Sequence, residues 1–398
     1  MTSTLDAQVD EAAPPGLPDP VPFFTQAETF SCLWAEIAAR LDGVFADGKF
    51  SHGTAVRAFE QALAAWTGAR YAIGVNSGTD ALVLLLRAAG LRSGDEVVVP
   101  AYGFVATASA VVLAGGRPRF ADVDPYAYAL DPEAAEAAVT GATRMLMPAH
   151  MFHRLADVEA LAVVARRHGL TLVEDSAEGI GMRRGGRHAG LFGAGGVLSF
   201  FPTKTLGALG DAGAVLTDDP ELAATVAALR HHGRPGDTIA NFPAINTGSA
   251  LWGYNSKMDD VQAAVLHAKL GRLREGIARR RELADAYSER LRAMPGIRRL
   301  PVPAPGEEPV YYVYLIEAER RDDLAAALAR AGIGTEVYYP RPLALQPCFA
   351  DLGHRPGEFP HAEAACRYAL ALPLHPDLRD EQIDRVCDAI AAFYGGTR

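Results

Sequence analysis

The chain has 398 residues, of which 49 % are hydrophobic and 22 % are charged, a balance typical of a folded globular protein with a sizeable core. Its formal net charge of −10 argues against a nucleic-acid-binding surface, because phosphate binding needs clustered cations. The four cysteines, at positions 32, 348, 366 and 387, form no CxxC pair, so neither a zinc ribbon nor a thiol redox site is expected.

The sequence contains no run of about 18 apolar residues that could cross a membrane. The first basic residue is Arg40, so the beginning of the chain lacks the positive charge of a secretory signal. We therefore expect a cytoplasmic protein without a membrane partner. Residues 1–22 are rich in proline, alanine and acidic side chains, and they are expected to form a flexible N-terminal tail.

From about residue 54, segments with helical periodicity alternate with short apolar runs typical of strands. Helices are expected at 54–66, 80–90, 104–116 and 157–169 and from position 132, and strands at 71–75, 96–100, 117–123, 144–151 and 170–176. This alternation predicts an α/β fold with a mixed, mostly parallel central sheet flanked by helices. Ligands of such sheets bind beyond the carboxyl ends of the strands, where segments 76–79, 100–104, 149–153 and 174–179 should meet.

A different pattern follows residue 195. Two apolar strands are expected at 195–202 and 212–219, joined by a glycine-rich loop that contains a lysine. A long amphipathic helix is predicted over 257–294, and a strand, a helix and a strand at 311–316, 322–332 and 334–339 indicate a smaller α+β domain. The predicted organisation is a large domain over 23–255 and a small C-terminal domain over 256–398 that begins with the long helix.

Lys204 is unusual because only four of the 38 basic residues are lysines. Arginine would serve for simple charge, but it does not lose its proton and cannot act as an amine nucleophile. A lysine can, when desolvation or Schiff-base formation with a carbonyl removes the charge. A solvated surface lysine is the alternative interpretation. The preceding sequence lacks the glycines of a Walker A loop, which excludes that motif.

Two other motifs could complete a site with this lysine. The segment 76–82, NSGTDAL, joins a strand to a helix, and its free backbone N–H groups either bind a phosphate or are capped by Ser77 or Thr79. Asp175 closes a buried strand, with Glu174 on the opposite face, and its carboxylate pairs either with a protonated heterocycle or with an arginine. An amine, an anion site and a carboxylate together fit pyridoxal phosphate.

The sequence resembles the DegT-type sugar aminotransferases, which are fold-type I pyridoxal phosphate enzymes acting on nucleotide-linked keto sugars or keto-cyclitols. The resemblance runs from about residue 50 to residue 378. Its most specific segments are NSGTDAL, GDEVVVPAYGFVATA, ADVDP, VEDSAEGIG, SFFPTKTLGALGDAGAV, GYNSKMDDVQAAVL and FPHAE, which occur in this order.

The resemblance implies roles for two residues in the reaction. Lys204 would bond covalently to the cofactor aldehyde and later shuttle a proton to and from the substrate carbon. Asp175 would pair with the pyridine nitrogen. The amino group would pass through pyridoxamine phosphate as an intermediate form of the cofactor.

The resemblance also implies how the cofactor is held. Ser77, Gly78, Thr79 and Ser199 would bind its phosphate, Phe104 would stack on its ring, and Glu178 would lie beside the ring hydroxyl, where the family usually has glutamine or histidine. Asn255 would reach the phosphate of a neighbouring subunit's cofactor, so the expected active unit is a homodimer with shared sites.

Departures from the family pattern cluster where the substrate should lie. His153, with the two residues after it, replaces a Gly-Gln-Pro pattern, and Tyr338 replaces a common histidine. The residues expected to contact substrate are Tyr102, His150, His153, Lys257 and Tyr338. The HxxH formed by His150 and His153 lacks an apparent third ligand, so no metal site is expected.

The function that this resemblance implies is transfer of an amino group from glutamate or glutamine to a keto sugar, in amino-sugar or antibiotic biosynthesis. A keto-cyclitol is an alternative acceptor. Two other functions remain open at this point: a sugar dehydrase, in which the family replaces the lysine by histidine, and a regulatory protein that has kept the fold without catalysis. Retention of Lys204 and Asp175 argues against both.

Overall fold

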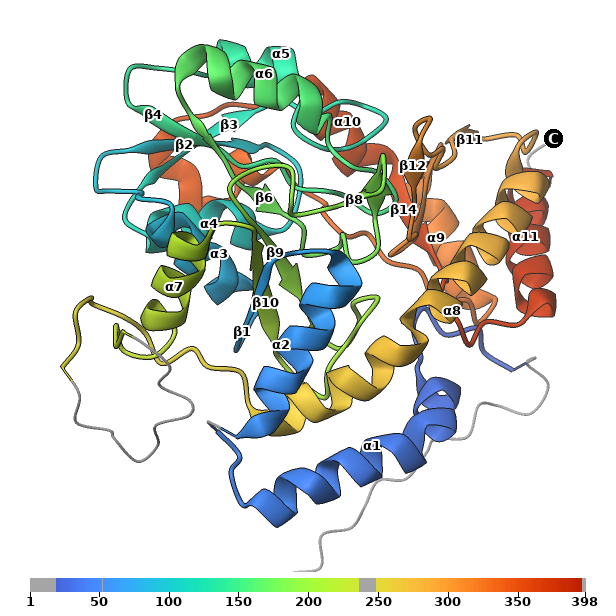
Figure 1. The fold of residues 1–398 in the computed structure, drawn as a ribbon. Helices are drawn as coiled ribbons and strands as arrows, with labels where there is room; N and C mark the ends of the chain where they lie inside the picture. Colours follow the sequence, from blue (N-terminus) through green and yellow to red (C-terminus); the bar gives the residue numbers. More distant parts are fainter. Residues whose placement is uncertain (1–18, 52, 236–247, 396–398) are drawn as a thin grey trace, which may run out of the picture.

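The computed structural model describes residues 19–51, 53–235 and 248–395 (Figure 1). The first half of this described chain contains α1 (Ala27–Asp47), α2 (Thr54–Thr67), β1 (Tyr71–Val75), α3 (Gly78–Ala88), β2 (Glu96–Pro100), α4 (Val105–Leu113), β3 (Arg117–Ala121), α5 (Pro132–Ala137), β4 (Thr143–Leu146), α6 (Val158–His168), β5 (Thr171–Leu172) and β6 (Glu174–Asp175). Next come β7 (Arg183–Arg184), β8 (Arg187–His188), β9 (Gly196–Ser199), β10 (Gly213–Thr217) and α7 (Pro220–Leu229).

The C-terminal part begins with the long helix α8 (Asp260–Leu291). It continues through β11 (Ile297–Arg299), β12 (Glu307–Glu308), β13 (Tyr314–Ala318), α9 (Arg321–Arg330), the 3-10 helices η1 (Leu343–Leu345) and η2 (Pro347–Leu352), α10 (Pro360–Tyr368), β14 (Ala369–Leu372) and α11 (Asp380–Gly395). The small antiparallel sheet has the order β11-β13-β14.

The central sheet is mixed and mostly parallel, as the alternating pattern predicts. Strands β1-β10-β9-β6 and β3-β2-β4-β5 form its two halves. The halves meet where β5 runs on into β6 through Val173, whose N–H donates to the Leu146 carbonyl at 3.0 Å. Only β10 is antiparallel to its neighbours β1 and β9 within this sheet. The carboxyl ends of the parallel strands therefore meet at one edge.

Both faces of this sheet are buried. Successive side chains of a strand point to opposite sides, and the side chains on each side pack into an apolar cluster. Ile73 and Val75 belong to one apolar cluster with α3 and α4, whereas Ala72 packs into another with α2 and α8. Val197 and Leu198 divide between the two clusters in the same way. Helices thus cover the sheet on both sides (Figure 1).

The long helix α8 contributes to the cores of both sheets and also packs against α1. Leu266 and Leu273 pack with the central sheet, whereas Leu283 and Tyr287 pack with the small C-terminal sheet. The helix is predicted over 257–294 and is observed over Asp260–Leu291. It therefore joins the two parts of the molecule rather than lying wholly in the second one.

Three expectations about the fold need correction. The tail predicted for 1–22 reaches too far, because Val21 is only 1 % exposed and pairs with Ile333 in the core of the small domain; residues 1–18 lie outside the described part. Helix α1 was not expected. The strand predicted at 334–339 is reduced to a single bridge between Glu336 and Ala371.

The buried Asp260, at the start of α8, joins this helix to α2. Its carboxylate accepts hydrogen bonds from the backbone N–H groups of Gly53 at 2.9 Å, Ala55 at 3.1 Å and Val56 at 3.2 Å. These donors lie at the N-terminus of α2, where the helix itself supplies no acceptors. A side chain from another helix thus caps α2.

Replacing Asp260 by alanine should lower the free energy of unfolding by about 1–3 kcal/mol, because three donors of α2 lose their acceptor. Chemical denaturation measures the difference. Asp259→Ala is the matched control, because Asp259 is exposed and its side chain caps no helix. Equal stability of the two variants would contradict this role of Asp260.

Candidate active site

Lys204 lies in the loop between β9 and β10, which we call the lysine loop (residues 200–212). Antiparallel pairing of the two strands closes the loop at its base, where the N–H of Phe200 donates to the Ala212 carbonyl at 2.8 Å. The chain doubles back within it, because a Cβ atom on Gly207 would lie 2.2 Å from the Pro202 oxygen. Glycine is required at that position.

The Lys204 ammonium faces a carboxylate and an aromatic ring. Its Nζ lies 3.3 Å from Oε1 of Glu178 and 4.3 Å from the ring centroid of Tyr312. Burial is the largest single influence and disfavours the charged amine, but the charge and hydrogen bond of Glu178 together with Tyr312 and Asp175 outweigh it, so the pKa of Lys204 is raised above its ordinary value. Without a cofactor, this lysine is an ammonium at neutral pH.

Glu178 is 5 % exposed and holds several parts of the site together. Its Oε2 accepts the backbone N–H of Phe152 at 2.9 Å, and its Oε1 accepts the Tyr339 hydroxyl at 3.3 Å as well as the Lys204 ammonium. Every oxygen of this buried carboxylate therefore has a donor, as a buried charge requires.

Asp175 ends β6 at the edge predicted for ligand binding. Its Oδ2 accepts the Thr107 hydroxyl at 2.6 Å, and its Oδ1 accepts the N–H of Ala177 at 3.2 Å. The Asp175 charge also helps to raise the pKa of Lys204. The two groups therefore lie within electrostatic range of each other. No arginine forms an ion pair with Asp175 within the described residues.

The expected anion site lies at the N-terminus of α3. Ser77 caps this helix by accepting the N–H of Asp80 at 3.1 Å. Gly78 faces Ser199 so closely that a Cβ atom on the glycine would lie 2.8 Å from the serine Cβ. Thr79 follows in the first turn of the helix. Free N–H groups and hydroxyls thus gather where a phosphate would be favoured.

Asn255 and Lys257 lie beside this helix end. Lys257 bridges to Val75 at the end of β1, and the Ser256 hydroxyl donates to Oδ1 of Asn76 at 2.8 Å. Asn255 is exposed and accepts a hydrogen bond from Lys257. Burial and the nearby cations Arg234 and Arg230 lower the pKa of Lys257.

Phe104 also lies at this edge. It precedes α4, and 59 % of its surface is exposed, so its ring is free to cover a bound group. Its backbone carbonyl accepts the N–H of Thr107, the residue that hydrogen bonds to Asp175. The candidate stacking residue and the candidate ring-nitrogen partner are therefore linked through one turn of α4.

Three residues expected to contact substrate are instead buried in the protein. Tyr102 is 1 % exposed among Tyr128, Phe152 and Tyr339. His150 is also 1 % exposed; its Nε2 lies 2.9 Å from Glu174, and its Nδ1 accepts the N–H of Ala156.

His153 is likewise 1 % exposed and stacks on Tyr311, and burial lowers its pKa to about 3. This low pKa makes the ring neutral. The substrate roles expected for Tyr102, His150 and His153 therefore find no support in this geometry. No group of three or more histidine, cysteine, aspartate or glutamate residues able to hold a metal ion occurs in the described chain.

Sequence reasoning missed Tyr312 and Thr107. The Tyr312 ring lies under the Lys204 ammonium, and its hydroxyl lies 3.2 Å from that of Thr203 and accepts the Tyr338 hydroxyl at 3.3 Å. Tyr338, which was expected near the substrate, therefore contacts the hydroxyl of Tyr312, whose ring faces Lys204. No local motif marks Tyr312; the run YYVY only predicts a strand.

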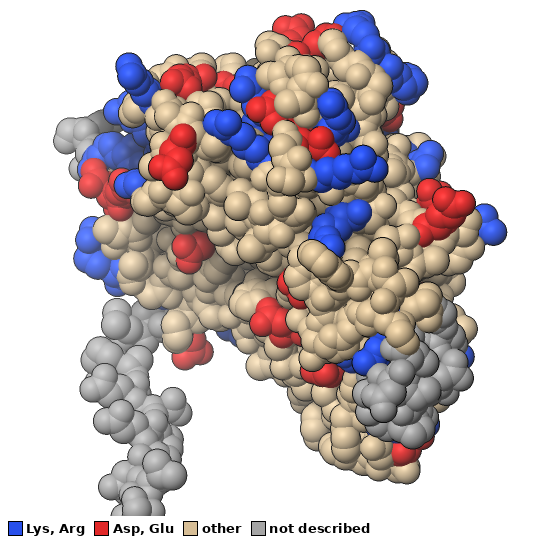
Figure 2. All heavy atoms as spheres, turned by 90° about the vertical axis from the view of Figure 1, so that its left-hand side faces the viewer, with Lys and Arg blue, Asp and Glu red and all other residues tan. Residues whose placement is uncertain are grey.

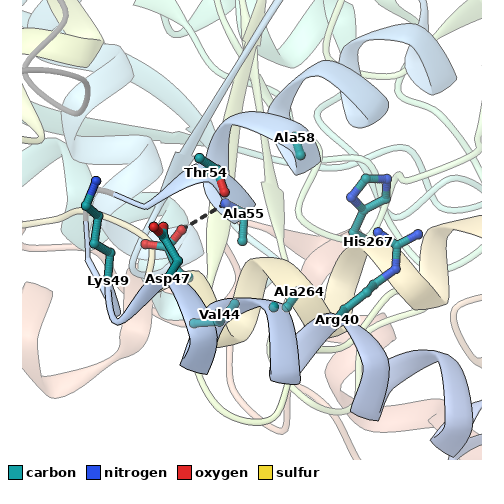
Figure 3. Close-up of a pocket in the computed structure, with 11 residues that line it drawn as sticks. Arg40, Val44, Asp47, Lys49, Thr54, Ala55, Ala58, Ala264 and His267 are labelled. Atoms are coloured by element: carbon teal, nitrogen blue, oxygen red, sulfur yellow. Dashed lines mark hydrogen bonds between the residues drawn. The ribbon is translucent and has the colours of Figure 1, made fainter.

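Two surface features lie apart from this site. A hollow of about 260 Å³ between α1, α2 and α8 is lined by Arg40, Lys49 and His267 among others, and it contains none of the predicted site residues (Figure 3). On the face shown in Figure 2, acidic and basic side chains are interspersed among uncharged residues. No described helix is both long and apolar enough to cross a bilayer.

The residues present fit pyridoxal phosphate. Lys204 supplies an amine, Asp175 a carboxylate held by Thr107, and the close contact of Gly78 with Ser199 leaves backbone donors at the α3 terminus uncovered by side chains. The Ser176 and Thr205 hydroxyls are buried without a hydrogen-bond partner in the described structure. The fold is that of a fold-type I aminotransferase, and this donor set fits the cofactor of such an enzyme.

The comparisons with known proteins identify the family. Residues 31–391 match the DegT/DnrJ/EryC1/StrS aminotransferase family. The "Pleiotropic regulatory protein" of Geobacillus stearothermophilus is 40 % identical over 375 residues, which cover 94 % of this chain and 98 % of the relative. The "dTDP-3-amino-3,4,6-trideoxy-alpha-D-glucose transaminase" of Streptomyces venezuelae is 39 % identical over 372 residues, covering 93 % of this chain and 95 % of the relative.

A solved structure agrees with these matches. The crystal structure of S. venezuelae DesV in complex with a ketimine intermediate superimposes with a TM-score of 0.88 at 39 % identity, covering 94 % of this chain and 98 % of that one. The chain belongs to the DegT/DnrJ/EryC1/StrS aminotransferase family. It is an aminotransferase whose cofactor is pyridoxal 5′-phosphate.

Replacing Glu178 by glutamine should lower the pKa of Lys204 in the cofactor-free protein, because the anion that stabilises the ammonium is removed while its burial remains. Protein grown with ¹³C-labelled lysine gives one set of side-chain signals for each of its four lysines, which makes the titration readable. Glu317→Gln removes another buried carboxylate, which contacts Tyr128 and Arg299, and should not alter it. An unchanged Lys204 pKa in Glu178→Gln would contradict the assigned charge balance.

Proposed function

We propose that the protein transfers an amino group from glutamate or glutamine to a nucleotide-linked keto sugar, in amino-sugar or antibiotic biosynthesis. The observation that carries this proposal is the shared site of Lys204, Glu178 and Asp175 in a member of a sugar aminotransferase family. The printed name of the S. venezuelae relative, a transaminase of a dTDP-linked amino sugar, supports the substrate class. A keto-cyclitol is the alternative acceptor.

Each protein group has a task in this proposal. When bound, pyridoxal phosphate supplies an electron sink for the carbon that loses or gains a proton. Lys204 would anchor the cofactor and then carry that proton at Nζ. Asp175, oriented by Thr107, would keep the pyridine nitrogen protonated. Glu178 contributes to the charge of the lysine amine and would lie beside the ring hydroxyl.

Binding of the cofactor phosphate falls to the α3 terminus. Ser77, Gly78 and Thr79 would offer backbone N–H groups and hydroxyls there, and Ser199 would add a hydroxyl from β9. The partial positive charge of a helix N-terminus favours an anion. Phe104 would cover the ring, and the aromatic wall of Tyr312 and Tyr338 would limit access of water. Lys257 would contribute a cation to a phosphate of cofactor or substrate.

A regulatory protein that has kept the fold is the second candidate, and the printed name of the G. stearothermophilus relative favours it. The ion pair between the partly buried Lys204 and the buried Glu178 argues for catalysis. Desolvating two charges costs several kcal/mol per ion before their attraction repays it, so such a pair is a weak source of stability. A reaction at the Lys204 amine explains this ion pair better than a contribution to stability does.

We also propose that the active unit is a homodimer with shared sites. Asn255 is exposed at the rim of the site and would reach the cofactor phosphate of the partner subunit. The solvent-facing side of the α4 region is apolar, with Phe104, Val112 and Leu113 between 52 % and 61 % exposed. Exposed apolar patches of this kind mark interaction surfaces.

The test of the proposed activity follows the visible absorbance of the purified protein loaded with pyridoxal phosphate. Glutamate or glutamine should bleach it, and a nucleotide-linked keto sugar should restore it. Lys204→Ala should lose turnover entirely, because no amine remains to anchor the cofactor or carry the proton. Lys49→Ala, which removes an exposed lysine outside the site, is the control. Absorbance that does not respond to either donor would overturn the proposal.

The shared site has its own test, by mixing two inactive variants. In a mixed dimer of Lys204→Ala and Asn255→Ala, one site keeps its own Lys204 and receives an intact Asn255 from the partner subunit. Mixing should therefore restore up to about a quarter of wild-type activity, because half of the dimers are mixed and each has one complete site. No recovery after subunit exchange would show that Asn255 serves its own subunit.

A further inference from the structure

Lys269, on α8, is a second lysine connected to the lysine loop. It is 6 % exposed, although nearly all other cations of this chain are arginines. Its Nζ donates to the Gly207 carbonyl and to Oε1 of Gln26, each at 2.5 Å, and lies 4.7 Å from the ring centroid of Phe30. The described residues offer it hydrogen-bond acceptors and a ring face, but no carboxylate at ion-pair distance.

Gln26 completes this contact. Its Nε2 donates to the Pro202 carbonyl at 3.0 Å, while its Oε1 accepts from Lys269. Pro202 and Gly207 are the two positions at which the lysine loop doubles back on itself. One side-chain pair therefore holds both carbonyls, and Lys204 lies between them in the chain. We call Gln26 and Lys269 the loop clamp.

From these contacts we propose that the loop clamp positions the Lys204 amine for the reaction, with Lys269 as a positioning residue that touches neither cofactor nor substrate. The proposal rests on the proposed function, because it assigns Lys204 the reactive amine. A lysine suits this place better than an arginine. Its compact ammonium has three donors and fits between one carbonyl, one amide and one ring, whereas a planar guanidinium needs more room.

The energetic cost of this cation supports a functional reason for it. Burial lowers the pKa of Lys269 to about 8, and the charge of Asp377 only partly opposes this. Asp377 is itself engaged by the first turn of α1, where its carboxylate accepts the N–H groups of Glu28 and Thr29. Burying an ammonium group costs free energy that burying an apolar side chain of similar size would not. The charge allows two charge-assisted hydrogen bonds, one to the Gly207 carbonyl in the loop that carries Lys204 and one to Gln26, which itself contacts that loop.

The first experiment uses the cofactor-free protein, so it does not depend on the aminotransferase reaction. Protein with ¹³C-labelled lysine is compared as wild type, Lys269→Met and Gln26→Leu, with Lys49→Met as the control. Loss of the clamp should shift the side-chain signal and the pKa of Lys204, because its distance from Glu178 changes. Lys49→Met should leave both as in the wild type.

The second experiment uses the protein loaded with pyridoxal phosphate. Lys269→Met and Gln26→Leu should each lower kcat about 10-fold with little change in the KM of the keto sugar, because a displaced reactive group weakens the chemical step more than substrate binding. The double variant should lose little more than either single variant, because both remove the same clamp.

The outcomes separate this proposal from the proposed function. The positioning role would be overturned if the Lys269→Met variant lost thermal stability but kept the NMR signal of Lys204, the pKa of Lys204 and kcat. If Lys269→Met does not fold, Gln26→Leu tests the same clamp without removing the buried cation. If the wild type transfers no amino group at all, the proposed function fails, and the titration of Lys204 still decides whether the clamp positions this amine.

Discussion

The ion pair between Lys204 and Glu178 organises the active site. Nζ of the lysine lies 3.3 Å from Oε1 of the glutamate. The carboxylate comes from the turn after β6, the amine from the loop after β9, and the ring of Tyr312 from the segment before β13. None of these groups is a neighbour of the others in sequence. The site therefore exists only when the sheet edge, the lysine loop and the C-terminal part of the chain are packed together.

The candidate site residues predicted from the sequence are those whose neighbouring residues already indicate an unusual role. Lys204 and Asp175 each follow an apolar strand, where a charged group is costly and so needs a reason. Thr107 gives no such signal: it lies within an apolar helix, 68 residues from the aspartate that it contacts. The substrate role expected for His150 finds no support in the structure. This residue follows a strand at the correct edge, but the buried Glu174 on the neighbouring strand draws its ring into the protein.

The same distinction applies to the fold. The central strands were predicted because β-branched runs such as EVVVP are buried on both faces and need no partner to be recognised. Helix α1 was missed since its apolar residues lie on more than one side: Leu33 and Ile37 are buried, whereas Trp34 and Phe45 are 59 % and 61 % exposed. Such a helix has no clean period, and packing against α8 decides its structure.

The central sheet and the small C-terminal sheet are coupled through the chain segment that precedes α1. Val21 is buried in the small-domain core, and five residues later Gln26 contacts the lysine loop. The small domain also supplies Asp377, which holds the first turn of α1, and Tyr312, which faces the Lys204 ammonium. The loop is thus held from the small domain along two separate routes. The position of the lysine loop therefore depends on contacts from the segment before α1 and from Tyr312, whose hydroxyl lies 3.2 Å from that of Thr203.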